Sequence, residues 1–259
     1  MMITDSFDIS SEPIVTPEAF FGKREKLCDI CIATYSKLIF EDVLERYQCE
    51  KLCEIEICDG NRSVYGFEHN GVKIGFFLSH IGSALAGNNI VEVGAHVGAT
   101  KYIFFGSAGS LDGEATKGKF VVPTSACRDE GMSYHYAPPS DYIDIKNSGK
   151  VARIFDGLKV PYVRGKIWTT DALYRETKKN AALRKNEGCI AVEMETAGLE
   201  AVCDFHGFEL YVFLMTGDVL DTEEYNRGEL SGVNHCISNF DVALKIAEKI
   251  GGGETCSES

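Results

Sequence analysis

The chain has few basic residues, few prolines and no long apolar run. Its 26 Lys and Arg residues face 39 Asp and Glu residues, and the net charge of −13 argues against binding nucleic acid through its phosphates. No apolar run approaches the roughly 20 residues of a membrane span, and the first ten residues carry acids where a signal peptide carries Lys or Arg. We therefore expect a cytoplasmic protein with no nucleic-acid or membrane partner.

The six prolines are scattered, and no linker rich in Pro, Gly or Ser interrupts residues 20–250. Because 44% of the residues are hydrophobic, the chain has enough apolar material for one large core. We predict a single domain over residues 21–250. A flexible segment over residues 1–20 and a disordered tail over 251–259 are expected to flank it, since small polar segments bury little surface.

Ten cysteines are present, several of them within apolar runs. Without an export signal, disulfides are not expected, and a free cysteine packs as a small apolar side chain. Cys28-x-x-Cys31 and Cys49-x-x-x-Cys53 have the spacing of zinc ligands, but no histidine stands close in sequence to complete the set. We predict free thiols, with no metal and no organic cofactor.

Short apolar runs alternate with stretches of helical period along the chain. Strands are expected over residues 27–33, 72–78, 102–105, 120–122, 189–192 and 210–215. Helices are expected over residues 36–47, 84–96, 177–186, 196–206 and 234–250. This alternation predicts an α/β fold, a three-layer α/β/α sandwich around a mixed, mainly parallel sheet. Ligands in such sheets bind beyond the carboxyl ends of the strands.

The segments after the predicted strands carry the polar groups. Residues 106–110 (GSAGS) have the composition of a turn that holds an anion, although most short Gly/Ser turns have no ligand. Glu193 and Glu195 share a face of an extended segment, where a carboxylate can accept both hydrogen bonds of a vicinal diol. Alternatively, both acids favour the positive end of the following helix. Asp218 is either a proton donor or a turn residue. Together these positions predict one site.

Two loops also concentrate functional groups, at residues 128–139 and 168–177. Loops of this composition line sites or simply lie in solvent. In the second loop, Arg175 can donate two parallel hydrogen bonds to a planar base, or pair with Glu176 or Asp171.

From residue 27 to residue 250, these segments in this order resemble the nucleoside phosphorylase family. That family includes uridine phosphorylases, hexameric purine nucleoside phosphorylases and methylthioadenosine nucleosidases. The most specific part is residues 192–198 (VEMETAG), which are similar to the family's ribose-binding motif. Residues 106–109 are similar to its phosphate-side glycine turn, and residues 128–139 and 169–177 resemble a uridine-phosphorylase-like branch.

The resemblance implies a role for each matching residue. Asp218 matches the acid that protonates the leaving base in purine-specific members, and Glu195 is the second catalytic residue. Arg62 matches an arginine that reaches the phosphate of a neighbouring subunit, so the resemblance implies a homodimer or homohexamer. The implied contacts are, for ribose, Met194, Glu195 and Ile81; for phosphate, Gly106, Ser107 and Arg62; and for the base, Leu173, Tyr174, Arg175 and Glu193.

Two positions depart from the family pattern. Residues 34–39 replace a Gly-Asp-Pro-x-x-Arg phosphate loop, so that Ile39 stands where an arginine is usual, and Phe104 stands where the family often has a second arginine. Each charge-assisted contact contributes about 1.5–3 kcal/mol. Phosphate affinity therefore depends on a compensating cation such as Lys37 or Arg128.

The sequence thus predicts a nucleoside phosphorylase. It would cleave the N-glycosidic bond of uridine or a purine nucleoside with inorganic phosphate as co-substrate, giving free base and ribose 1-phosphate. Asp218 favours purines, whereas Arg175 and the loop over residues 128–139 favour uridine. The alternatives are a phosphate-independent nucleosidase, which the two missing arginines favour, and a non-catalytic nucleoside-binding protein.

Overall fold

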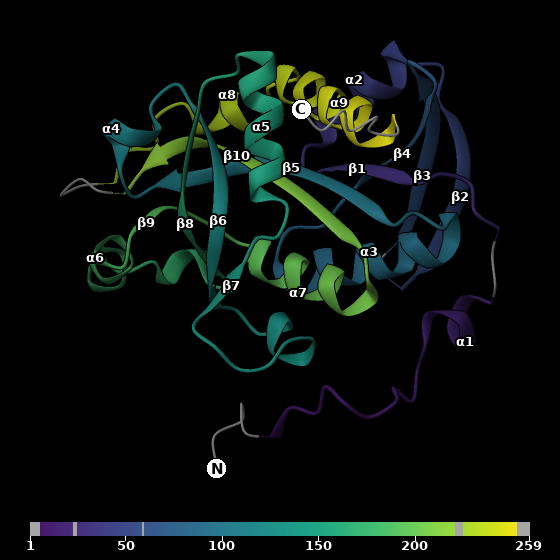
Figure 1. Cartoon of the computed structure of the whole chain (residues 1–259), viewed down its shortest axis with the longest axis horizontal. Coiled ribbons are helices and arrows are strands. Elements are labelled where there is room, and N and C mark those ends of the chain that lie inside the picture. The colour runs from purple at the N-terminus through teal and green to yellow at the C-terminus, as the bar shows by residue number, and fades with distance from the viewer. Residues whose placement is uncertain (1–5, 23–24, 59, 221–224, 253–259) are drawn as a thin grey trace, which may run out of the picture.

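The structure is a computed structural model that describes residues 6–22, 25–58, 60–220 and 225–252 (Figure 1). Its strands are β1 (Ile30–Thr34), β2 (Glu50–Ile57), β3 (Gly60–His69), β4 (Val72–Leu78), β5 (Lys101–Ser110), β6 (Phe120–Asp129), β7 (Tyr142–Asp144), β8 (Tyr162–Thr170), β9 (Cys189–Glu193) and β10 (Glu209–Val219). Its α-helices are α1 (Pro17–Phe21), α2 (Lys37–Arg46), α3 (Ser83–Val97), α4 (Gly113–Thr116), α5 (Ser148–Leu158), α6 (Lys178–Asn186), α7 (Thr196–His206), α8 (Leu230–Asn234) and α9 (Ser238–Gly251). Short 3₁₀ helices lie at Met132–His135 and Leu173–Arg175.

The described strands form one ten-stranded sheet with the order β10-β6-β8-β9-β5-β1-β4-β3-β2, and β7 pairs with β6. β10 also pairs with β5, so β10, β6, β8, β9 and β5 close into a ring that the remaining strands extend. Strands β4, β1, β5 and β10 run parallel, as do β6, β8 and β9, whereas β2, β3 and β4 form an antiparallel meander. A mixed α/β fold with a large sheet, as the sequence predicted, is confirmed.

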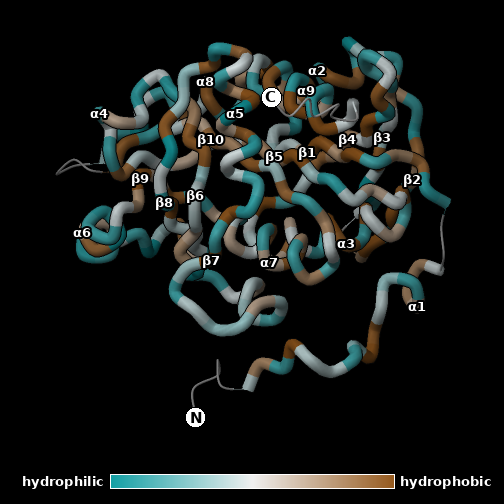
Figure 2. Tube along the Cα trace, in the orientation of Figure 1, coloured by the Kyte–Doolittle hydropathy of each residue, from teal (hydrophilic) through white to brown (hydrophobic). Residues whose placement is uncertain are grey.

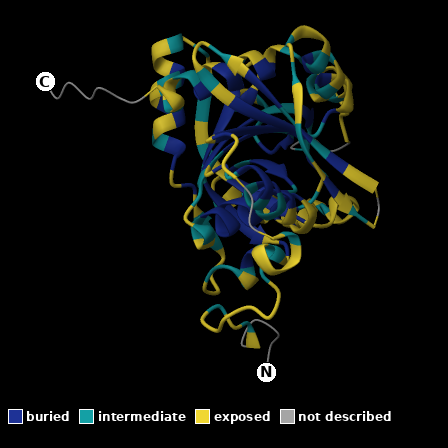
Figure 3. Ribbon diagram, turned by 90° about the vertical axis from the view of Figure 1, so that its right-hand side faces the viewer, coloured by how far each residue is buried: buried dark blue, intermediate teal, exposed yellow. Residues whose placement is uncertain are grey.

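Helices cover both faces of the sheet, which gives three layers (Figure 1). One core cluster lies under α3 and α7, and the other lies under α2, α5 and α9. In β5, Tyr102 and Phe104 belong to the first cluster, whereas Ile103 and Phe105 belong to the second. Alternate side chains of a strand point to opposite faces, so a strand buried on both faces is apolar throughout. The central strands are accordingly hydrophobic in Figure 2 and buried in Figure 3.

Several elements were not predicted, and the clearest case is the hairpin of β2 and β3. β2 pairs with β3 alone and lies at the sheet edge, and of its residues only Ile55 is fully buried. An edge strand with charged residues facing solvent carries no apolar run that a sequence pattern detects. β7, β8, α4 and α5 were missed as well.

The interpretation of residues 106–110 as a turn is wrong, because they continue β5. Gly109 pairs with Val192 of β9 on one side and with Asp218 of β10 on the other. Backbone pairing on both sides keeps this glycine-rich segment extended. Gly106 lies against the ring of Tyr35, because a Cβ at Gly106 would be 3.2 Å from that ring.

Both ends of the described chain are more helical than predicted. Helix α1 begins after Thr16, whose hydroxyl accepts from Ala19 N, and the Phe21 ring packs on His96. Helix α9 includes Gly251, although a tail was predicted from that residue. Residues 1–5 and 253–259 lie outside the described part, so flexibility at the ends stays a prediction.

The cysteines of the described residues are free thiols. Cys28 and Cys31 are both buried, with their sulfur atoms 3.8 Å apart. Within the same described ranges, no group of three or more His, Cys, Asp or Glu side chains is placed to hold a metal ion. None of the helices described here is both long enough and apolar enough to span a bilayer. Cytoplasmic location stays a prediction.

Candidate active site

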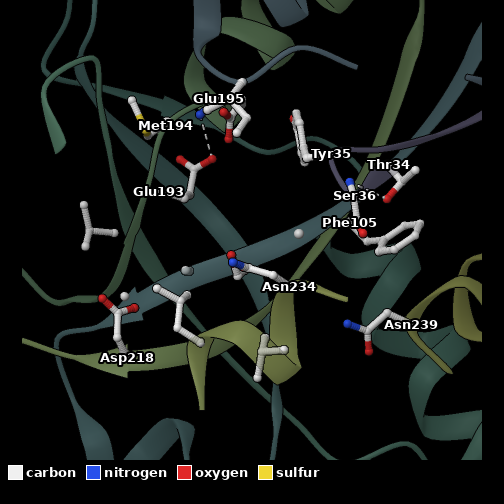
Figure 4. Close-up of a pocket in the computed structure, with 18 of the residues that line it drawn as sticks. Thr34, Tyr35, Ser36, Phe105, Glu193, Met194, Glu195, Asp218, Asn234 and Asn239 are labelled. Carbon is white, nitrogen blue, oxygen red and sulfur yellow. Dashed lines mark hydrogen bonds between the residues drawn. The ribbon is translucent and has the colours of Figure 1, made fainter. Parts of the chain in front are cut away.

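A cavity of about 380 Å³ opens where β1, β4, β5, β9 and β10 end. It lies beside the connection from β9 to α7, and α8 and α9 cover another side (Figure 4). Ligand pockets of about 300–1,000 Å³ are usual for small molecules, so the volume suits a ligand of nucleoside size.

The carboxylate of Glu193 stabilises the wall of the cavity, because its oxygens accept hydrogen bonds from groups of the chain itself. Its carboxylate accepts from the backbone N–H groups of Glu195 and Thr196, at 2.8 Å each, and from the hydroxyl of Thr169. An acid at the N-terminus of α7 satisfies backbone donors that have no partner in the helix. Glu193 was predicted to bind the base, but its oxygens already hold β8, β9 and α7 together.

Glu195 occupies the middle of the cavity wall. Its Oε1 accepts from Gly82 N at 2.6 Å, and Gly82 has a φ of +96°, which favours glycine. Burial and the neighbouring Glu193 charge raise the pKa of the Glu195 carboxyl to about 8. The raised pKa favours the protonated carboxyl near neutral pH, and positive charge arising on a bound sugar would favour its ionised form.

A β-bulge directs Asp218 into the cavity. The register of β10 against β5 shifts between Thr216 and Asp218, so Gly217 is the extra residue. Gly217 lies so close to α8 that a Cβ there would be 2.8 Å from Leu230 Cα. Bulges re-aim side chains in this way next to active sites. Asp218 was predicted to follow a strand, whereas it lies inside β10.

Asp218 shares its end of the cavity with a second carboxyl group, that of Glu176. Burial raises the pKa of Asp218, although the hydroxyl of Tyr225 donates to its Oδ2 at 3.1 Å. Burial and the charge of Asp218 raise the pKa of Glu176 to about 7. Because burial and the Asp218 charge disfavour ionisation of Glu176, Glu176 keeps its proton to a higher pH than an isolated glutamate does.

The opposite end of the cavity is lined by Ser36, His235 and Asn239. Ser36 caps α2 by accepting from Ile39 N, and its hydroxyl is hydrogen-bonded to His235 Nδ1 at 2.7 Å. Asn239 is only 3% exposed, yet its Oδ1 has no hydrogen-bond partner. In Figure 4 Ser36 and Asn239 lie on the opposite side of the view from Asp218.

Most of the predicted site residues line this one cavity. They are Ile81, Gly106, Ser107, Leu173, Glu193, Met194, Glu195 and Asp218. Tyr174 and Arg175 do not line it, and Tyr174 is 95% exposed. Base contacts by these two residues are not supported, because the short 3₁₀ helix that carries them turns Leu173 and Glu176 inward instead.

Arg62 lines a separate cavity beside β3 and β4. Its guanidinium is buried, donates to Glu92 Oε2 at 2.7 Å and contacts His80. The chain alone does not bring Arg62 to the site described above, and its role in a neighbour's site stays a prediction.

Lys37 and Arg128, which were considered as substitutes for the missing phosphate arginines, interact with groups outside the cavity. Lys37 is exposed and pairs with Glu41. The Arg128 guanidinium donates to the carbonyls of Ala137 and Pro138, which fixes its own loop. The described residues that line the cavity include four carboxyl side chains and neither lysine nor arginine.

Sequence reasoning missed several lining residues. Tyr35 and Ser36 stand where the resemblance placed a phosphate loop, and Glu176 was weighed only as a partner of Arg175. His235 and Asn239 lie where one continuous helix was predicted. The helix breaks between α8 and α9, and this break turns their side chains toward the cavity.

The chain and its fold are matched by known proteins. A family model described as the phosphorylase superfamily matches residues 29–241. The chain belongs to this superfamily. Among its relatives, a purine nucleoside phosphorylase of the DeoD type from Caldanaerobacter subterraneus is 28% identical over 214 residues, covering 79% of this chain and 89% of the relative. An uncharacterized protein of Acanthamoeba polyphaga mimivirus is 32% identical over 162 residues, covering 61% of this chain and 63% of that protein.

Solved structures of the same superfamily share the fold. A futalosine hydrolase of Helicobacter pylori aligns with a TM-score of 0.69 at 18% identity, covering 86% of this chain and 98% of that one. A 5′-methylthioadenosine/S-adenosyl homocysteine nucleosidase of the same organism aligns with a TM-score of 0.68 at 20% identity, covering 86% and 100%. The superfamily's named members thus include phosphorylases and hydrolases that act on nucleosides.

Proposed function

We propose that this superfamily member cleaves the N-glycosidic bond of a purine nucleoside. The observation that carries the proposal is the position of Asp218 and Glu195 on one cavity of nucleoside size. Cleavage passes through a sugar with oxocarbenium character while negative charge grows on the base. A catalyst therefore needs an acid near the base and a negative group near the sugar.

Asp218 supplies the acid. Burial raises the pKa of its carboxyl, and Glu176 beside it has a pKa of about 7, so a proton is held at this end of the cavity near neutral pH. That proton passes to a ring nitrogen of the purine as the C1′–N bond breaks. The base then leaves neutral, which lowers the barrier to departure.

Glu195 supplies the group on the sugar. Its Oε1 accepts from Gly82 N and its side chain lines the cavity, so the ribose hydroxyls are the expected partners of its remaining acceptor positions. As positive charge develops on the ring, the ionised form of this buried carboxyl becomes favoured. The interaction is stronger in the transition state than in the ground state, which is the requirement for catalysis.

The negative charge of the cavity favours water, rather than phosphate, as the group that attacks the sugar. The carboxyl groups of Glu176, Glu193, Glu195 and Asp218 line it, and Lys37 and Arg128 are bound elsewhere. A phosphate dianion would lose hydration here without gaining an ion pair from a lysine or arginine among the described residues that line the cavity. Hydrolysis, which releases free base and ribose, is therefore our first candidate.

Phosphorolysis is the second candidate, because hydroxyl and backbone groups gather on one side of Glu195. Ser36 caps the N-terminus of α2, and Ser107 lines the cavity beside Gly106. Helix N-termini and hydroxyl groups bind phosphate in many proteins. A neighbouring subunit that contributes Arg62 would supply the missing charge, and a phosphorylase is among the relatives.

One assay separates these candidates. The purified full chain is mixed with inosine, adenosine, guanosine and uridine, with and without inorganic phosphate, and the free base and sugar products are quantified. We expect purine release without phosphate, with ribose as the product. Base release that requires phosphate and yields ribose 1-phosphate would replace the first candidate with the second. No release from any nucleoside would contradict both.

A pair of variants excludes contaminating enzymes from the expression host. Glu195→Gln should abolish most of the activity, because the amide cannot carry the charge that stabilises the sugar. Glu114→Gln, at an exposed position of α4, should leave the activity unchanged. Equal activity in the two preparations would show that the measured reaction does not occur in this cavity.

A further inference from the structure

Two cysteines that the proposed reaction does not use lie side by side at the start of β1. Cys28 and Cys31 are free thiols whose sulfur atoms are 3.8 Å apart. Cys28 is 4% exposed and Cys31 is 0% exposed. A disulfide bond joins sulfur atoms about 2 Å apart, so bond formation would bring these two atoms closer by about 2 Å. The two thiols are therefore placed to lose two electrons together.

The local structure makes room for both sulfur atoms. The chain bends at Asp29, between the two cysteines, and the backbone N–H of Cys28 donates to Val97 O at 3.3 Å. Cys31 pairs with Gly75 of the neighbouring strand β4. A Cβ at Gly75 would be 2.6 Å from Cys31 Sγ and 2.9 Å from Cys28 Sγ. The space that the sulfur atoms share thus exists because position 75 has no side chain.

The two thiols differ in their acidity. A hydrogen bond from the Cys31 thiol lowers the pKa of the Cys28 thiol, although burial opposes this effect. The Gly75 backbone and the charge of Lys26 also favour the Cys28 thiolate. Burial raises the pKa of the Cys31 thiol. Because the thiolate is the nucleophile in thiol chemistry, Cys28 is the cysteine that reacts first.

An open cavity of about 460 Å³ reaches Cys28 where β1, β4 and β5 begin, at the ends of these strands away from the candidate active site. Cys31 is not among the described residues that line it. Three lysines contribute to the lining: Lys26, Lys73 and Lys101. Asp29, which pairs with Lys26, is the one acid among the described lining residues. The cavity therefore has an excess of positive charge, although the whole chain carries −13.

We propose that Cys28 and Cys31 form a reversible dithiol–disulfide site whose oxidants are small anionic disulfides of the class of oxidised glutathione. The lysines attract the carboxylates of such a reagent, and the cavity brings its sulfur atoms to Cys28. The site is separate from the cavity assigned to nucleoside cleavage. The proposal therefore does not depend on the proposed function, and its tests measure no base release.

The reaction is an exchange in two steps. Cys28 gives its proton to solvent, and its thiolate attacks one sulfur of the disulfide RSSR. The S–S bond of the reagent breaks, and one RS⁻ leaves and takes up a proton. Cys31 then loses its proton and attacks the Cys28 sulfur, which releases the second RS⁻ to be protonated in turn. The two cysteines lose two electrons, and RSSR is reduced to two RSH.

Peptide mapping of the full chain tests the site. The reduced protein is incubated under native conditions with oxidised glutathione, its remaining thiols are alkylated, and it is digested with trypsin. Residues 27–37 (LCDICIATYSK) form one tryptic peptide, whose cysteines are Cys28 and Cys31 alone. We expect this peptide to escape alkylation, to be lighter by two hydrogen atoms, and to regain both thiols with dithiothreitol. Two free thiols in this peptide, at a concentration that modifies the exposed Cys58, would overturn the proposal.

Three variants test the order of the steps. Cys31→Ala should stop after the first step, with glutathione retained on Cys28. Cys28→Ala should leave Cys31 unmodified, because Cys31 has no exposed surface. Cys58→Ala is the control and should form the Cys28–Cys31 disulfide at the wild-type rate. Glutathione on Cys31 in the Cys28→Ala variant, or none on Cys28 in the Cys31→Ala variant, would contradict the order. Circular dichroism shows whether each variant is folded, and peptide mapping of the wild-type chain requires none of them.

The preference for an anionic reagent is tested with two disulfides of opposite charge. Rates of disulfide formation in the wild-type chain are compared for oxidised glutathione and cystamine, each relative to its rate with 2-mercaptoethanol. The net charge of −13 by itself favours the cationic cystamine. We expect oxidised glutathione instead to react about threefold faster or more at low ionic strength, and added salt to reduce this advantage. An equal or faster relative rate for cystamine would overturn the anionic class.

A matched pair of lysine variants shows whether the cavity causes this preference. Lys73→Gln and Lys117→Gln remove the same charge from exposed positions, but only Lys73 lines the cavity. Lys73→Gln should reduce the advantage of oxidised glutathione over cystamine, because the local attraction is weaker. Lys117→Gln should keep the wild-type ratio. Equal ratios in the two variants would show that the cavity does not select the reagent and would overturn that part of the proposal.

Discussion

At the scale of single residues, the two acids of the proposed reaction have different surroundings. Asp218 lies beside Glu176 and accepts a hydrogen bond from the Tyr225 hydroxyl. These surroundings suit a group that donates a proton. The Glu195 carboxyl accepts from a backbone N–H and lies beside the charge of Glu193. These surroundings suit a group whose ionised form becomes favoured as positive charge develops on the sugar. Pairs of carboxyl groups in unlike environments commonly divide acid and electrostatic roles in this way.

The proposed role of Asp218 as the acid leads to a prediction about leaving groups. Asp218→Asn should lower kcat/KM for the preferred purine nucleoside by about 10²–10⁴, the usual contribution of general acid catalysis. The same variant should lose less than about tenfold on p-nitrophenyl riboside, because nitrophenolate leaves without a proton. Steady-state kinetics with both substrates measure this difference. An equal loss on both would mean that Asp218 acts on the sugar or on the fold instead.

Residues that the sequence identified differ in kind from those it missed. Glu195 and Asp218 follow or end buried strands, and a pattern of apolar runs reveals such positions. The contact of Ser36 with His235 joins residues 199 positions apart, and no local pattern encodes it. The resemblance assigned Glu193 to the base, but neither a resemblance nor the spacing along the chain shows which donors already surround a side chain.

At the scale of elements, the connection from β9 to α7 links three elements that line or support the site. The Glu193 carboxylate accepts from two backbone N–H groups at the start of α7 and from the Thr169 hydroxyl of β8. Thr169 in turn accepts from Ala197 N, so three elements share one set of hydrogen bonds. The same segment carries Met194 and Glu195 into the cavity.

From these hydrogen bonds we predict that truncation of Glu193 lowers the stability of the fold. Glu193→Ala should lower the free energy of unfolding by about 2 kcal/mol or more, because several buried donors lose their acceptor and α7 loses its cap. Urea unfolding followed by circular dichroism measures the change. Glu114→Ala, at an exposed position of the short helix α4, is the control and should change stability by less than about 0.5 kcal/mol. Unchanged stability in Glu193→Ala would contradict the assigned role.

Which elements the sequence could predict depends on their burial. β5 and β10 are apolar because both of their faces are covered, so their cores were recognised, although their ends were placed too early. β2 exposes its charged residues at the sheet edge and was missed. The extension of β5 through Gly106–Ser110 depends on pairing with β9 and β10, which are contacts between distant parts of the chain.

At the scale of the whole molecule, several buried carboxyl groups couple folding to pH. Burial raises the pKa of Glu200 in α7 to about 7, and burial with the Glu193 charge raises that of Glu195 to about 8. The folded state keeps these protons to a higher pH than the unfolded chain does. Unfolding therefore releases protons between about pH 4.5 and pH 8, and stability falls as the pH rises through this range.

Glu200 allows this coupling to be tested away from the cavity, which it does not line. Its Oε1 accepts from Lys146 N, and its Oε2 has no partner. Glu200→Gln should raise the free energy of unfolding at pH 8 by about 1–2 kcal/mol, because no charge is then buried, and should give no gain at pH 5. Urea unfolding at both pH values measures this. Equal effects at the two pH values would contradict a protonated Glu200.

The sequence by itself indicated the superfamily and the α/β fold class, and it pointed to Glu195 and Asp218, which both line the cavity. These features depend on local patterns: apolar runs, helical periods and the residues that follow a buried strand. Only the tertiary structure showed that Arg62 and Arg175 lie outside the cavity and that Asn239 lines the cavity. It also showed that Lys37 and Arg128 interact with groups away from the cavity. Those outcomes depend on which elements pack together and on the bulge and helix break that aim side chains. Short-range patterns specify where a strand lies, whereas packing between distant segments specifies what its neighbours can bind.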